Sequence, residues 1–306
     1  MPNRRWLLAV VTLAGWMAAP ATISLAQTRA PADWIALAAG GFAVPQGATA
    51  AGLLVEMNPL LASADPRLRD EVAYSAAQRW IVRDALVAPD DLRRLLELWS
   101  SNLDDGLGST GDDRVFKRSF SALCLSLIAA REVTAPFLRP EEGRRFLDRM
   151  LDYFGRERDL RGFEPDRGWI HTPAHTADAL KFLARGAHFA PADLGRLLAA
   201  LRAKIEASES VFVWGENDRM AWALHAAVRR PDAETAAFEA WTARWIDDHA
   251  ALWAGGPQVD PRRFARVENG KQLLRSLAAI LSMERTPTGS GETARMAAVT
   301  ALARMR

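Results

Sequence analysis

The chain has 306 residues, with 39 lysines and arginines against 37 aspartates and glutamates, and a formal net charge of +2. Two of the arginines fall within the first 26 residues, and without them the opposite charges balance, which argues against a nucleic-acid-binding protein because such a surface needs a basic excess. A single cysteine excludes an intramolecular disulfide and a cysteine-based metal cluster.

The first 26 residues have the three parts of a secretory signal peptide. Arg4 and Arg5 supply the positive charge, residues 6–19 form a short apolar run, and small residues at Ser24 and Ala26 suit a cleavage site after Ala26. The apolar run is short for a transmembrane span and Pro20 follows it. We therefore expect an exported protein, periplasmic or secreted, with no stable membrane anchor after cleavage. The choice between the general and the twin-arginine route stays open.

The rest of the chain is predicted to be helical. We expect a linker and a short helix over 27–49, a helical domain over 50–285, and a linker with a short helix over 286–306. Helix-opening pairs such as Asp65-Pro66 and Asp260-Pro261 mark where individual helices begin. Within the domain, helices are predicted over 53–61 and 66–86 and over a stripe at 116–127. Further helices are predicted to begin at residues 89, 140, 173, 191, 217 or 218, 231 and 261.

Apolar residues recur at helical spacing throughout the domain. Phe116, Phe120, Leu123 and Leu127, for example, share one face of a predicted helix. The run VFVW at 211–214 is strand-like but too short to require a sheet. About a dozen helices with short connections predict an all-α fold, an irregular HEAT-like α-α superhelix of stacked antiparallel helix pairs.

The stretch from 159 to 185 departs from this ordinary pattern. Its glycines and proline predict a loop, and Thr172 followed by Pro173 reads as the N-cap and first residue of a helix. His171 then precedes the helix, His175 lies in the first turn, and Asp178 shares a face with His175.

Three interpretations of this stretch are open. His171, His175 and Asp178 could ligate zinc or iron, although zinc takes three or four ligands and the chain has no second group of this kind. The histidines could instead hydrogen-bond loop carbonyls while Trp169 packs as a plug, which is a purely structural role. They could also line a groove for a polar ligand or a peptide. We expect no metal and no other cofactor.

Two other polar loops are predicted near this stretch. Loops near residues 112, 168 and 215 recur after about two helices each, and such connections emerge on the same edge of stacked helix pairs. The candidate groove therefore comprises Trp169, His171, His175, Asp178, Trp214, Glu216, Asp218 and Arg118.

Four segments carry a family resemblance in their order along the chain. They are ADPRLRDEVAYSAAQRWI, GDDRVFKRSFSALCLSLIAAR, PFLRPEEGRRFLDRMLDYFGRERDLRGFEPDRGWIHTPAHTADAL and VFVWGENDRMAWAL. In this order they resemble a bacterial family catalogued as domain of unknown function 2785, over roughly residues 50–285. The resemblance implies an α-helical domain and no established activity, cofactor or partner. The chain differs from the family pattern at Pro173, so the start of that helix is left open.

The sequence favours a binding or interaction scaffold for a protein, peptide or small-molecule ligand. It contains no Gly-x-Ser-x-Gly elbow, phosphate loop or dinucleotide fingerprint. The alternative is a metal-dependent enzyme of the hydrolase type that uses His171, His175 and Asp178.

Overall fold

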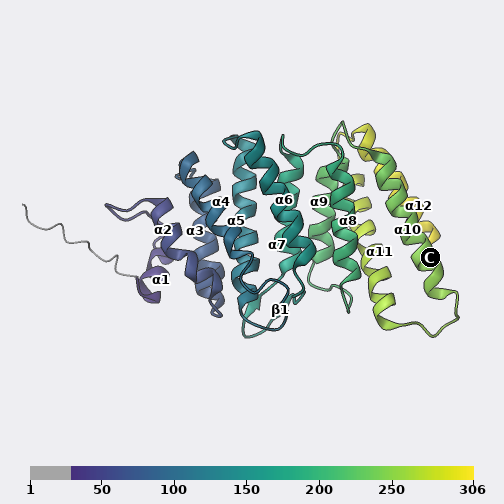
Figure 1. Cartoon of the computed structure of the whole chain (residues 1–306), viewed down its shortest axis with the longest axis horizontal. Coiled ribbons are helices and arrows are strands. Elements are labelled where there is room, and N and C mark those ends of the chain that lie inside the picture. The colour runs from purple at the N-terminus through teal and green to yellow at the C-terminus, as the bar shows by residue number, and fades with distance from the viewer. Residues whose placement is uncertain (1–28) are drawn as a thin grey trace, which may run out of the picture.

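The computed structural model describes residues 29–306, so the predicted signal peptide at 1–26 lies outside the described residues. The described chain is all-α, as predicted, and its helices follow one another in an elongated row (Figure 1). None of the helices in this part is both long and apolar enough to cross a membrane. The helices are α1 (Pro31–Ala39), α2 (Ala50–Met57), α3 (Ser75–Ala77), α4 (Pro89–Asn102), α5 (Arg114–Thr134), α6 (Pro140–Arg156), α7 (Thr172–Arg185), α8 (Asp193–Glu206), α9 (Glu216–Val228), α10 (Thr235–Trp253), α11 (Pro261–Ser282) and α12 (Gly289–Arg304).

The helices form two layers, and the superhelical arrangement is confirmed. Helices α5, α7, α9 and α11 contact one another in turn and make one layer, while α6, α8 and α10 contact one another in the other layer. The two layers are joined by consecutive helices that pack in pairs, α4 with α5, α6 with α7, α8 with α9 and α10 with α11. Because alternate helices run in the same direction, the N-terminal ends of α5, α7 and α9 lie at one edge (Figure 1).

The apolar stripes read from the sequence form the core. Phe120, Leu123 and Leu127 of α5 are buried with Cys124, and Trp99 of α4 is buried in the same core. Phe116 is buried in a small separate cluster with Val115 and Ile170, beneath the loop that precedes α7. A small apolar cluster, separate from the main core, therefore lies at the edge at which α5 and α7 begin.

The segment predicted as one helix over 66–86 has a wider backbone. Arg67–Tyr74 and Gln78–Arg83 are π-helical, on either side of the short α3. Its backbone hydrogen bonds join residues that are five apart in the chain, such as the bond from the Asp84 amide to the Arg79 carbonyl at 2.8 Å. Side-chain periodicity alone does not separate a π-helix from an α-helix at this length, because both place apolar residues on one face.

The remaining boundaries differ from the predicted ones by a few residues. Helix α8 begins at Asp193 and α10 at Thr235, each a few residues after the proline predicted to open it, and residues 211–214 form no strand. The loop before α7 contains two short antiparallel strands, β1 (Phe163–Glu164) and β2 (Gly168–Trp169). This hairpin holds Trp169 at the edge where α7 starts.

Replacement of Leu123 by alanine tests the α5 stripe. Leu123 is 8% exposed in the main core. We expect Leu123→Ala to lower the free energy of unfolding by about 2–5 kcal/mol, because it removes buried contacts and leaves a cavity. Urea denaturation followed by circular dichroism measures this. Val133→Ala is the matched control, since Val133 lies on the same helix but is 37% exposed. Equal effects of the two substitutions would contradict the packing of α5.

Candidate functional site

Three loops meet at the edge where α5, α7 and α9 begin. The loop before α5 contacts the loop before α7, since the Gly111 amide donates to Asp159 Oδ2 at 2.9 Å and Arg161 Nη2 donates to the Asp112 carbonyl at 3.0 Å. The loop before α9 reaches the same place, where the Trp214 ring lies 6.1 Å from that of Trp169. The structure thus brings together the loops near residues 112, 168 and 215.

Helix α7 begins one residue earlier than predicted. Its N-cap is His171, whose φ of 54° and ψ of 34° place it in the left-handed region, and Thr172 is the first helical residue. The Thr172 hydroxyl does not cap the helix but donates to the Asp159 carbonyl. A left-handed conformation is uncommon outside glycine and is often kept at binding or catalytic sites. Here it turns the chain from the hairpin directly into α7.

His175 is buried against α5. Its Nδ1 is 2.8 Å from Ser119 Oγ, and its ring makes an edge-on contact with Phe120 at 5.0 Å between centroids. The Ser119 hydroxyl donates its single hydrogen to the Ile170 carbonyl. Nδ1 of His175 must then carry a proton and donate to Ser119 Oγ, which leaves Nε2 as an acceptor. Burial shifts the pKa of His175 well below its usual value, so this neutral tautomer persists at pH 7.

His171 stacks on Trp169 and faces Glu216. The two stacked rings are 4.8 Å apart and nearly parallel. His171 is 7% exposed, and its buried Nε2 forms no hydrogen bond with any described residue. Glu216 Oε1 is 3.9 Å away, too far for a hydrogen bond. Burial, with help from nearby Arg219, lowers the pKa of His171 to about 4, so the pair is not an ion pair at neutral pH.

Glu216 is the first residue of α9 and is almost fully buried. Its Oε2 accepts a hydrogen bond from the Trp214 amide at 2.9 Å. A helix N-terminus and an amide donor both favour the charged carboxylate. Burial outweighs them and raises the pKa of Glu216 above its usual value. We call Trp169, His171, His175, Trp214 and Glu216 the edge cluster.

Asp178 lies one turn after His175 but pairs with cations. Its Oδ1 accepts from Lys181 at 3.0 Å and its Oδ2 accepts from Arg219 at 2.6 Å. Both carboxylate oxygens are therefore engaged by positive groups. Within residues 29–306, no group of three or more His, Cys, Asp or Glu side chains is arranged to hold a metal ion.

An open surface adjoins the edge cluster. Trp214 is 45% exposed, and its ring is also 5.5 Å from Phe163 of the hairpin. A cavity of about 460 Å³ lies between the loop before α9, the start of α9, and α11. Asp218 lines the cavity and accepts a hydrogen bond from Ser276 at 2.5 Å. The other residues that line it are Phe212, Val213, Gly215, Asn217, Gln272, Arg275 and Ser276.

Arg118 belongs to a neighbouring buried network. Its guanidinium pairs with both carboxylate oxygens of Glu157 and donates to the Asp105 carbonyl at 2.7 Å. Tyr153 also donates to Glu157, at 3.2 Å. The hydrogen bonds of Arg118 go to this network and to the loop before α5, so it positions the loops beside the edge cluster.

Sequence reasoning missed Arg69, which anchors the hairpin. Arg69 is fully buried and its guanidinium lies 4.1 Å from the centre of the Phe116 ring. It donates to the carbonyls of Ser63 and Arg167, each at 2.6 Å, and of Trp169 at 3.2 Å. Burial lowers its pKa to about 10. No local signal distinguishes Arg69, because its three acceptors are backbone carbonyls, two of them about a hundred residues away.

These features define the class of this protein: an all-α superhelix with a mostly buried histidine and tryptophan cluster at one loop edge. A family model described as "Protein of unknown function (DUF2785)" matches residues 103–279, which contain the three loops and the edge cluster. The chain belongs to this family. Neither the curated proteins nor the solved structures contain a match to the chain.

The low pKa of His171 predicts a pH-dependent stability. In the unfolded chain this histidine titrates near ~6.5 and in the folded chain near pH 4. Between these values the unfolded state binds the proton more strongly, so stability is lost as the pH falls. The full shift is worth on the order of 3 kcal/mol. His171→Asn removes this titration, and asparagine tolerates the left-handed backbone.

Calorimetric melting curves between about pH 7 and about pH 4.5 measure the effect of His171 on stability. We expect the melting temperature of the wild type to fall more steeply over this range than that of His171→Asn. Equal slopes for the two proteins would show that His171 is not buried in its neutral form.

Proposed function

We propose that the protein is a helical binding scaffold, an α-solenoid of irregular HEAT-like repeats, that takes a neutral polar ligand at the edge cluster. The observation that supports this most is His171 Nε2, a buried nitrogen without a hydrogen-bond partner beside the exposed Trp214. A buried polar atom without a partner destabilises the free protein by about 1–3 kcal/mol, and a ligand that pairs with it regains this energy.

The chemistry of the surface favours a peptide segment. Peptide groups present both a donor and an acceptor. The cavity beside Trp214 offers amide, carboxylate and hydroxyl groups in Asn217, Asp218 and Ser276. Trp214 adds an aromatic face, the kind of side chain that often dominates binding energy at such surfaces. The groove that we propose therefore runs over the 211–215 loop and the start of α9, and has the edge cluster as its floor.

A set of acetylated and amidated dipeptides tests the binding function, because these compounds are peptides without net terminal charge. We expect some of them to raise the melting temperature of the wild type. Trp214→Ala should weaken their binding about tenfold or more, because the substitution removes the exposed aromatic contact. Titration calorimetry gives the dissociation constants.

Trp222→Ala is the matched control, since Trp222 is 39% exposed and lies further along α9. Its affinities should equal those of the wild type. Failure of every dipeptide to stabilise the wild type, or equal binding by Trp214→Ala, would reject the proposal. Near-stoichiometric zinc, iron or manganese that is lost in His175→Ala would instead support the metal-dependent enzyme.

We also propose that the protein is exported, on the basis of the charge, apolar run and small residues within positions 1–26. Cleavage after Ala26 would give a mature chain that begins at Gln27. Intact-mass measurement of protein from a secreting host checks this expectation, and an uncleaved chain in the membrane fraction would contradict it.

A further inference from the structure

A second polar cavity lies where α8, α10 and α11 meet. It has a volume of about 210 Å³, and its walls include Arg202, Arg263, Arg266 and Trp245. No residue of the edge cluster lines it. Any ligand of this cavity would therefore be recognised by different groups from those of the proposed peptide groove.

Three residues that line this cavity each carry a buried donor with no acceptor among the described residues. Arg202 Nη1, Trp245 Nε1 and Arg266 Nε are all buried and form no hydrogen bond with any described residue. Only ten buried side-chain polar atoms in residues 29–306 lack a partner, and three of them belong to the walls of this one cavity. Trp245 is 1% exposed, so its indole N–H has no access to bulk water. A concentration of unpaired donors indicates a site for an acceptor.

The cavity also has an excess of positive charge. Arg202 donates to Glu206 at 2.7 Å and to Asp248 at 2.5 Å, so it engages both acids of the lining. Neither Arg263 nor Arg266 forms an ion pair with a carboxylate in the described part of the chain. Three arginines against two acids leave one uncompensated positive charge among the lining residues.

Arg202 is held in place before any ligand binds. Its guanidinium lies 4.7 Å from the centre of the Trp245 ring, in addition to its two carboxylate partners. Trp245 is itself packed against Trp241 and the backbone of Gly270, where an added Cβ would collide with the indole. Fixed donors of this kind bind with little loss of side-chain entropy.

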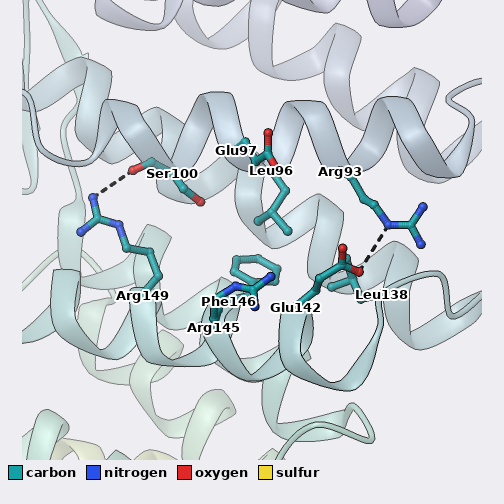
Figure 2. A pocket seen from close by; sticks show the side chains of 9 residues that line it. All are labelled: Arg93, Leu96, Glu97, Ser100, Leu138, Glu142, Arg145, Phe146 and Arg149. Atoms are coloured by element: carbon teal, nitrogen blue, oxygen red, sulfur yellow. Dashed lines mark hydrogen bonds and ion pairs between the residues drawn. The ribbon is translucent and has the colours of Figure 1, made fainter.

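A cavity of equal size between α4 and α6 provides a comparison (Figure 2). It is also about 210 Å³ and also lined by three arginines, Arg93, Arg145 and Arg149. Arg93 pairs with Glu142, and Arg149 donates to the Ser100 carbonyl at 2.9 Å. None of these arginines contributes a buried atom without a partner among the described residues. Arginine content alone therefore does not produce the unpaired donors near α11.

We infer that the cavity between α8, α10 and α11 binds a carboxylate group that carries a single negative charge. The two oxygens of a carboxylate can accept hydrogen bonds from a guanidinium and from the indole N–H. One negative charge balances the one excess positive charge, whereas a phosphate dianion would leave an excess of negative charge. The volume suits a short acid or the terminal carboxylate of a longer molecule.

N-acetylglycine and its amide test this inference, because they differ chiefly in the carboxylate. Titration calorimetry at constant ionic strength should detect N-acetylglycine and not the amide. Arg266→Gln and Trp245→Phe should each weaken binding of the acid about tenfold or more, because each removes one donor to a charged acceptor. Arg145→Gln makes the same charge change in the comparison cavity and should bind like the wild type.

Three results would overturn the inference. They are equal binding of the acid and the amide, unchanged binding by Arg266→Gln, and binding of inorganic phosphate in place of the acid. Circular dichroism of each variant separates loss of binding from loss of fold. Trp214→Ala should bind N-acetylglycine normally, so failure at this cavity and failure of the peptide groove are distinguishable.

Discussion

The side-by-side packing of α5, α7 and α9 is the constraint on which the edge cluster depends. Each pair is separated in the chain by one returning helix, so the three run in the same direction and begin at one edge. The loops that lead into them are therefore forced together. His171 before α7 and Glu216 at the start of α9 become neighbours although they are 45 residues apart in the chain.

Two buried guanidinium groups fix these loops by different means. Arg118 is neutralised by Glu157 and so ties the end of α6 to α5. Arg69 has backbone carbonyls and aromatic faces as partners, and it retains its positive charge in the core. Loss of either guanidinium or of its partners would destabilise the fold, because it would leave a buried polar group without a hydrogen-bond partner. The hairpin and the start of α7 are thus held rigidly beneath the more exposed Trp214, which suits a preformed binding surface.

The features that the sequence predicted are those with local causes. Apolar stripes such as Phe120 and Leu123 follow from the helical repeat, and the Asp260 side chain caps α11 as its position before Pro261 suggests. The features that it missed depend on distant partners. Thr172 was predicted to cap α7, but its hydroxyl donates to Asp159 and His171 takes the cap position instead. Arg118 is predicted beside the histidines, but its guanidinium pairs with the buried carboxylate of Glu157.

The two candidate sites differ in the charge states of their buried side chains. In the edge cluster, burial lowers the pKa of both histidines and raises that of Glu216, so the histidines stay neutral and the carboxylate is less readily ionised. Such a surface favours neutral polar groups, because a charged ligand would lose its hydration without a compensating partner. Near α11, three arginines and two acids line the cavity, so an excess positive charge remains and favours an anion. The chain could thus hold the neutral backbone of a ligand at the edge cluster and a carboxylate near α11. The charge state of the side chains at each site selects the group that it holds.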